Sequence, residues 1–193
     1  MKASSSDSLK DHFLLAMPSL DESVFRGSIT YICEHGEAGA MGIVINQPLE
    51  LNLDEIFDHL NIEIPDILLS AFSRHPVLSG GPVQIDHGFV LHPRGTSEWE
   101  SSLRVTEEIQ LTTSQDVLKA IAAGTGPEKF VVALGYAGWS AGQLEEEIAA
   151  NSWLTLPADR RIIFDTPVDE RLTRAAATLG VDMNLLTAEA GHA

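Results

Sequence analysis

The sequence is poor in cysteine, in basic residues and in long apolar runs, and each shortage excludes a class of protein. Cys33 is the single cysteine among 193 residues, so neither an internal disulfide nor a metal site built from several thiolates can form. Apolar runs such as residues 13–17 are far shorter than the ~20 residues that cross a bilayer. The N-terminal residues 1–7 are polar and lack the apolar core of an export signal. We therefore expect a protein that works in the cytoplasm and not in a membrane.

Basic residues are outnumbered, since 12 Lys and Arg stand against 28 Asp and Glu, for a formal net charge of −16. Proteins that bind nucleic acid through its backbone need a basic face that displaces counterions. Acidic residues alternate with the densest basic cluster, which contains Arg160, Arg161, Arg171 and Arg174. The charge therefore argues against direct binding to nucleic acid or to an anionic membrane, and it favours solubility.

The chain length suits one domain, and with 44% hydrophobic residues the chain can bury a substantial core. No linker, repeat or low-complexity segment divides it. We predict a flexible tail at residues 1–10 and a single domain over residues 11–193. Strand and helix patterns both occur in this domain, so the predicted fold class is α+β.

Strand patterns recur along most of the chain. Residues 28–35 alternate, with Ile29, Tyr31 and Cys33 on one face. A turn at 36–39 joins them to a second apolar segment at 40–46, which predicts a β-hairpin whose second strand is buried on both faces. Further strands are predicted at residues 12–17, 77–80, 88–92, 108–111, 130–134 and 161–164.

Helix signals occur in four places. Behind Asn52, a suitable cap, apolar residues recur at helical spacing at Leu53, Ile56, Phe57 and Leu60. Three more helices are expected to begin at capping residues, namely Thr113 with Asp116, Ser140 with Gln143, and Thr166 followed by Pro167 and Asp169. Residues 62–75 fit neither the helical nor the strand period.

Cys33 and His35 are the first candidates for chemistry. Because they are two residues apart on one predicted strand, their side chains would point the same way, with Cα atoms ~6–7 Å apart. That spacing allows a thiolate–imidazole pair or a redox-sensing thiol. The alternative is that Cys33, on one face with Ile29 and Tyr31, is buried among apolar neighbours, where a thiol has a raised pKa and low reactivity.

Two glycine-rich segments are candidate binding turns. Gly80 and Gly81 could aim backbone N–H groups at an anion, although neither a phosphate-loop lysine nor a GxGxxG spacing is present. A tight turn or the close approach of another backbone explains this pair more simply. The segment 135–140 follows a predicted strand and precedes a predicted helix, as a nucleophile elbow does. The GxSxG pattern is absent, however, and Ser140 fits a capping box with Gln143.

The remaining polar and aromatic candidates surround the same predicted helix. The seven histidines show no HxH or HExxH spacing, so we predict neither a metal site nor a cofactor. Glu145, Glu146 and Glu147 are expected to form a solvated first turn, which the helix dipole favours. Trp139 and Trp153 bracket this helix. They could line a small-molecule pocket or dock a partner, or they could anchor the helix in the core.

Taken in order, several segments resemble the signatures of the YqgE/AlgH family. They are residues 38–46, Gly80-Gly81-Pro82-Val83, residues 135–145 and Asn151-Ser152-Trp153-Leu154, and residues 13–18 and 31–35 are also similar. The resemblance extends from about His12 to Phe164. It implies one domain in which a bifurcated mixed β-sheet folds into a pseudo-barrel with flanking helices. The family's label of transcriptional regulator, tied to alginate production, implies a regulatory role, and the family supplies no catalytic or binding residues to carry over.

The function that we predict is that of a non-enzymatic regulatory or adaptor domain that acts through a protein partner or a small ligand. Its expected binding surface combines Gly80 and Gly81 with Tyr136, Trp139 and Gln143. Glycines allow close backbone approach, and tryptophan supplies apolar contact area.

An enzyme is the alternative interpretation. It would use Cys33 with His35, or Ser140, as its reactive groups. A third interpretation, a DNA-binding regulator, conflicts with the acidic charge of the chain.

Overall fold

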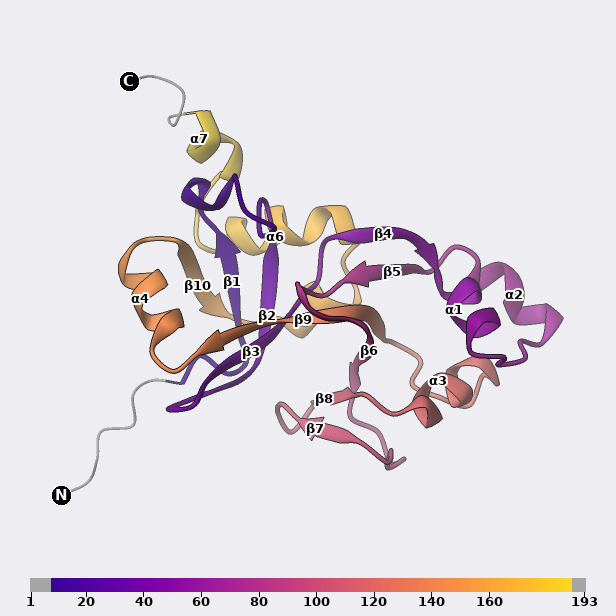
Figure 1. Ribbon diagram of the computed structural model, residues 1–193. Coiled ribbons are helices and arrows are strands. Elements are labelled where there is room, and N and C mark those ends of the chain that lie inside the picture. The colour runs from indigo at the N-terminus through magenta and orange to yellow at the C-terminus, as the bar shows by residue number, and fades with distance from the viewer. Residues whose placement is uncertain (1–7, 189–193) are drawn as a thin grey trace.

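The computed structural model describes residues 8–188, and a ten-stranded sheet forms its centre (Figure 1). The strands are β1 (His12–Ala16), β2 (Ile29–Gly36), β3 (Gly39–Val44), β4 (Pro48–Asn52), β5 (Pro76–Ser79), β6 (Val83–Pro93), β7 (Ser102–Arg104), β8 (Ile109–Thr112), β9 (Val131–Ser140) and β10 (Trp153–Pro157). The helices are α1 (Leu53–His59), α2 (Asp66–Phe72), α3 (Gln115–Ala122), α4 (Gln143–Ala149), α5 (Arg160–Phe164), α6 (Arg171–Thr178) and α7 (Met183–Ala188), with two 3₁₀ turns, η1 (Pro18–Leu20) and η2 (Val168–Glu170). Within residues 8–188, no helix is long and apolar enough to cross a membrane.

The sheet follows the order β10-β1-β2-β3-β9-β6-β8-β7, and every pair on this path is antiparallel. Strand β5 departs from the path, because it pairs in parallel with β9 and antiparallel with β4. The sheet therefore forks at β9 and curls into a half-barrel. Helices α1, α2 and α3 gather at one end of it, and α4 lies at the other end beside β10 (Figure 1). This arrangement confirms the predicted bifurcated mixed sheet with flanking helices.

Strand β9 joins the two halves of the sheet because its alternation of faces changes at Gly135. Before this residue, Val131 and Ala133 face the main core, and beyond it Tyr136 does. The other face of β9 also changes its alternation at Gly135. The half of this face before Gly135 packs under α3, and the half beyond Gly135 packs under α4. Gly135 has a left-handed φ of +76°, and a Cβ there would lie 2.4 Å from the carbonyl oxygen of Gly81. Only glycine fits this position.

Within residues 8–188, three apolar clusters hold the sheet and helices together. The main core lies between the sheet and the helices α5 and α6, and it includes Phe13, Tyr31, Cys33, Ile163 and Ala175. A second cluster lies beneath α1, α2 and α3 and includes Phe57, Phe72, Val90, Leu118 and Val132. A third lies beneath α4 and includes Leu14, Ile32, Trp139, Leu144 and Trp153. The sheet thus has a shared core on one face and two separate cores on the other.

Most predicted elements are confirmed, with small shifts at their ends. The hairpin at 28–46 is β2 and β3, and α1 begins behind Asn52, whose backbone N–H donates to Glu55 Oε2 at 2.8 Å. The helix predicted behind Thr113 is α3, and its N-cap is Ser114. Pro167 leads into the turn η2 before α6 begins, and the unassigned segment 62–75 contains α2.

Two predicted elements are wrong. Residues 161–164 form the helix α5 and not a strand, because the Asp159 side chain accepts the backbone N–H of Arg161 at 2.9 Å and caps a helical turn. A short apolar run of this length fits a buried strand and a buried helix equally well. In addition, β9 does not stop at Leu134, because pairing with β3 extends it through residues 137–140. The segment 135–140 is therefore strand and not a turn.

The tail predicted at residues 1–10 is described only in part, since residues 1–7 lie outside the described residues. Residues 8–10 are bonded to the domain. The backbone N–H of Leu9 donates to His35 Nδ1 at 2.8 Å, and Lys10 Nζ donates to the carbonyl of Arg104 at 3.0 Å. Hydrogen bonds therefore attach Ser8, Leu9 and Lys10 to the rest of the described chain.

Candidate functional site

The two glycine-rich segments predicted to form a binding surface do lie side by side, but they are buried against each other. The Gly80 N–H donates to the Leu134 carbonyl at 2.8 Å, and the Gly80 carbonyl accepts the Val44 N–H at 2.9 Å. A Cβ on Gly81 would lie 2.2 Å from the carbonyl carbon of Tyr136. Both glycines are buried and serve the close approach of two backbones, so neither presents N–H groups to an external anion.

Trp139 belongs to the core under α4, where it is 6% exposed. Its indole N–H donates to Glu147 Oε2 at 2.9 Å, and the indole N–H of Trp153 donates to the same oxygen at 2.8 Å. Gln143 Nε2 donates to the other oxygen, Oε1, at 2.9 Å. The expectation that Glu147 is simply solvated is therefore wrong, because its carboxylate anchors two buried indoles.

The other residues of the predicted surface also have structural partners. Tyr136 is half-buried and packs edge-on against Phe89, with ring centroids 5.6 Å apart. Gln143 is exposed, and its Oε1 accepts the backbone N–H of Ser140 at 3.0 Å and the Ser140 hydroxyl at 3.2 Å. Among residues 8–188, no hydrogen bond joins Ser140 to a histidine that could activate it. The structure therefore assembles neither a continuous exposed surface from these residues nor a serine nucleophile.

Cys33 and His35 lie on opposite faces of the sheet, so the predicted thiolate–imidazole pair does not form. The register of β2 against β3 shifts between Ile32 and Glu34, which makes Cys33 a bulged residue and reverses the alternation beyond it. Cys33 is fully buried in the main core, where burial raises the pKa of its thiol well above the ordinary value. The His35 ring instead lies toward α4, where Nε2–H donates to Glu145 Oε1 at 2.8 Å.

The His35 ring is held in one tautomer. Nδ1 accepts the Leu9 N–H, so the ring proton is on Nε2, where it reaches Glu145. The His35 side chain is only 4% exposed. Hydrogen bonds from its own backbone N–H and from His35 lower the pKa of Glu145. These contacts tie the N-terminal segment and β2 to α4, which is a structural role.

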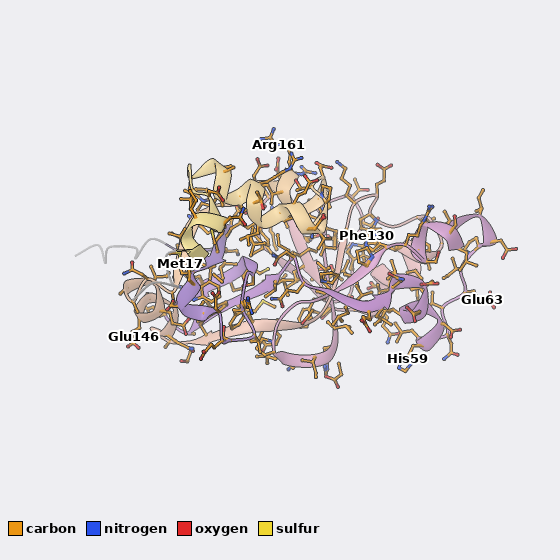
Figure 2. All side chains as sticks on the ribbon, turned by 90° about the horizontal axis from the view of Figure 1, so that it is seen from above. Met17, His59, Glu63, Phe130, Glu146 and Arg161 are labelled. Carbon is orange, nitrogen blue, oxygen red and sulfur yellow. The ribbon has the colours of Figure 1, made fainter. Side chains whose placement is uncertain are left out.

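The best-formed candidate site is a cavity of about 570 Å³ between α1, α3 and β6. Its apolar walls come from several separate segments and consist of Leu51, Ile56, Leu60, Val90, Leu118, Val132 and Leu134. Strand pairing positions part of this wall, because Val90 lies opposite Val132 and Gly88 lies opposite Leu134. Figure 2 places His59, at this cavity, at the opposite end of the molecule from Glu146 of α4. A cavity of roughly 300–1,000 Å³ with mostly apolar walls is typical of small-molecule sites.

Polar groups line the mouth of the cavity. Thr113 and His59 are exposed there, and their side chains make no hydrogen bond within the part of the chain that the structure describes. His87 Nδ1–H donates to Asp86 Oδ1 at 2.9 Å, and this bond lowers the pKa of Asp86. Glu55 is already engaged in the cap of α1. The hydroxyl of Thr113, the amide of Gln115 and the imidazole of His59 are therefore the groups most available to orient a ligand.

Sequence reasoning missed this cavity, because no local pattern links its walls. One signal was present, since Gly88 opens the segment that the sequence predicts as a strand at residues 88–92. Glycine inside a strand often marks a place where a ligand comes close. Between residues 8 and 188, no group of three or more His, Cys, Asp or Glu residues is placed to hold a metal ion.

Comparison with known proteins finds a family model and full-length relatives that agree with one another. A model of the family described as AlgH-like matches residues 13–184. The UPF0301 protein AlgH of Pseudomonas aeruginosa is 56% identical over 194 residues, which cover 100% of both chains. A UPF0301 protein of Saccharophagus degradans is 55% identical over 186 residues, which cover 96% of this chain and 89% of the relative.

Solved structures agree with these relatives. The solution structure of the AlgH protein from Pseudomonas aeruginosa covers 100% of both chains, with a TM-score of 0.79 and 54% sequence identity. A crystal structure of a protein from Corynebacterium diphtheriae has a TM-score of 0.69 and covers 92% of this chain and 90% of its own. At 16% identity it shows likeness of fold alone. The family match over most of the length, the full-length relatives and the shared fold together establish that this chain belongs to the AlgH-like family.

Proposed function

We propose that this protein is a cytoplasmic regulatory domain whose signal is a small, partly apolar molecule bound between α1, α3 and β6. The observation that carries the proposal is the cavity of about 570 Å³ there, with apolar walls and polar groups at its mouth. Apolar walls supply binding energy, and a few polar groups such as Thr113 and His59 fix the orientation of the ligand. The ligand class is thus a molecule with an apolar body and a hydrogen-bonding end.

Binding explains the arrangement of side chains better than catalysis does. Each residue considered as a reactive group is used elsewhere: Cys33 is buried in the main core, the His35 imidazole is bonded to Glu145, and the Ser140 hydroxyl is bonded to Gln143. None of these residues lines the cavity.

A ligand in this cavity would contact elements that are far apart in the sequence. It would touch α1, α3, β6 and β9 together, and it would stabilise whichever arrangement of them it binds best. With a net charge of −16, the chain is poorly suited to contact DNA directly. We therefore expect the signal to pass to a protein partner.

A substitution at Gly88 tests the proposal. Gly88 lies two residues from Val90 on β6, so a side chain there points into the cavity, and its Cβ meets no atom within 4 Å. We expect Gly88→Leu to fold and to fill the cavity. Gly95→Leu is the matched control, because a Cβ at Gly95 also meets no atom within 4 Å and Gly95 does not line the cavity.

The measurement is equilibrium dialysis of each protein, at a concentration of about ten times a micromolar dissociation constant, against one bacterial metabolite extract, followed by mass spectrometry of the small molecules on the protein side. The proposal predicts that the wild type and Gly95→Leu enrich the same compound by about tenfold or more, as expected for micromolar affinity. Gly88→Leu should lose this enrichment while keeping the circular dichroism spectrum of the wild type. Equal enrichment by all three proteins, or no enriched compound, would contradict the proposal.

A further inference from the structure

Arg171 is a buried cation, with 6% of the residue exposed. It is the first residue of α6, and its guanidinium is bonded only to neutral groups. Nε–H donates to the Thr166 carbonyl at 3.1 Å, and Nη1–H donates to the Ile45 carbonyl at 2.6 Å. Nη2 makes no hydrogen bond within residues 8–188, so part of the donor set remains available.

No carboxylate compensates this charge among the described residues, in contrast to the other arginines nearby. Arg160 pairs with Glu108 at 3.6 Å, Arg161 with Asp159 at 2.8 Å, and Arg174 with Glu170 at 2.9 Å. Burial lowers the pKa of Arg171 to about 10, so it remains charged at neutral pH. A buried charge is costly unless an opposite charge pairs with it. In a chain rich in acidic residues, the most buried guanidinium is thus left without an anion.

Arg171 lines a small cavity of about 160 Å³. This second cavity shares no residue with the larger cavity beside α1. Its walls are largely apolar and include Pro76, Leu78, Phe130, Val131, Phe164 and Val168. The volume corresponds to about five water molecules, at ~30 Å³ each in the liquid. An organic ligand of a few non-hydrogen atoms fits this space.

Two other polar side chains line this cavity, those of His75 and Thr166, and the Thr166 hydroxyl already donates to the Arg161 carbonyl at 3.1 Å. The His75 ring packs against Phe130, with ring centroids 4.6 Å apart, and its ring nitrogens make no hydrogen bond in the described part of the chain. Burial and the charge of Arg171 lower the pKa of His75. The imidazole therefore stays neutral at neutral pH, and it can donate one N–H to a bound anion without adding charge.

We propose that the cavity formed by Arg171, His75 and Phe130 binds a small organic monocarboxylate. A guanidinium matches a carboxylate in shape and charge, and one negative charge balances the one buried positive charge. Phosphate would bring additional charge and would leave the apolar walls without a partner. A short hydrocarbon tail, in contrast, fits against Leu78 and Val168.

The test is the stability of the full chain in urea, measured with sodium acetate, propionate or butyrate and with sodium chloride or phosphate at equal ionic strength. For a dissociation constant on the order of 1 mM, 50 mM propionate raises the ratio of folded to unfolded protein by roughly 50-fold. Propionate should exceed acetate because its tail buries apolar area, and chloride should have no specific effect.

Val168→Phe fills the cavity and keeps Arg171, so we expect it to abolish the carboxylate effect. Val24→Phe is the matched control at a 66% exposed valine, and it should respond as the wild type does. The Arg171 Nε–H signal in a proton–nitrogen NMR spectrum of the wild type gives an independent readout, which should shift with propionate and not with chloride. A purely structural Arg171 would show no such shift.

Several outcomes would overturn the proposal. They are equal effects of chloride and propionate, an effect of phosphate alone, or an unchanged carboxylate effect in folded Val168→Phe. If Val168→Phe does not fold, the NMR readout decides alone: a wild-type Arg171 Nε–H signal that does not shift with propionate overturns the proposal.

Discussion

At the scale of single residues, Glu147 stands in a sequence pattern that is typical of the surface, yet its carboxylate binds two buried tryptophans. It is the last of three consecutive glutamates at the start of α4, which is a typical solvated pattern. Only Glu147 is positioned above the third apolar cluster, where its Oε2 accepts both Trp139 and Trp153. Removing the carboxylate would leave two largely buried indole N–H groups without an acceptor.

We therefore predict that Glu147→Ala lowers the free energy of unfolding by about 2–3 kcal/mol, the usual cost of orphaned buried donors. Glu146→Ala, one residue earlier and exposed, should change it by less than ~0.5 kcal/mol. Urea unfolding followed by tryptophan fluorescence measures both values. Equal destabilisation by the two substitutions would show that the indoles do not depend on Glu147.

Cys33 shows what local sequence could and could not predict about a residue. Its apolar neighbours Ile29 and Tyr31 correctly indicated a buried thiol, since all three lie in the main core. The alternation also predicted that His35 shares this face, which is wrong because of the bulge at Cys33. A bulge depends on how the partner strand β3 pairs, and that information is not contained in β2 alone.

At the scale of elements, β9 was harder to predict than the short helices. Glycines at 135 and 138 are typical of a turn, and the apolar run 130–134 by itself predicts a strand that ends before them. The strand continues to Ser140 because β3 and β6 pair with it, and because Gly135 tolerates the left-handed backbone at the fork. Caps, in contrast, are local signals, so α1 and α3 were predicted within about two residues.

The cap of α3 supports a second prediction at this scale. Asp116 accepts the Glu100 N–H at 2.8 Å, the Ser114 hydroxyl at 2.6 Å and the Val117 N–H at 2.9 Å, and so it fastens the preceding loop to the helix. We expect Asp116→Ala to cost about 1–2 kcal/mol of stability at pH 7. Glu128→Ala removes the same charge at an exposed position and should cost less than ~0.5 kcal/mol.

This contribution of Asp116 should disappear in acid. Burial acts to raise the pKa of Asp116, but its hydrogen bonds outweigh that effect and the pKa is lowered. Because the folded-state pKa lies below the unfolded value of ~3.9, the stabilisation is present above about pH 4 and is lost as the pH falls through the folded-state pKa. Urea unfolding at neutral and at acidic pH should show the gap between wild type and Asp116→Ala closing. If the difference in stability between wild type and Asp116→Ala stayed constant with pH, the ionisation of Asp116 would not contribute to stability.

At the scale of the whole molecule, the sequence predicted the class of the fold but not its cavities. Apolar periodicity and caps predicted an α+β chain, and the resemblance of ordered motifs predicted the bifurcated sheet, as the AlgH structure from Pseudomonas aeruginosa supports. Each cavity, however, is lined by segments that only the folded sheet brings together. The positions of these segments depend on strand register and on the fork at Gly135, which are long-range properties.

The most direct test of the central claim is a methyl NMR titration of the wild-type protein with a bacterial small-molecule extract. If the cavity between α1, α3 and β6 is the binding site, the methyl signals of Val90, Leu118 and Val132 should shift, because these side chains line it. Those of Leu14, Ile32 and Leu144, in the cluster beneath α4, should stay in place. Shifts confined to the α4 cluster, or no shifts at any of these methyl groups, would contradict the account.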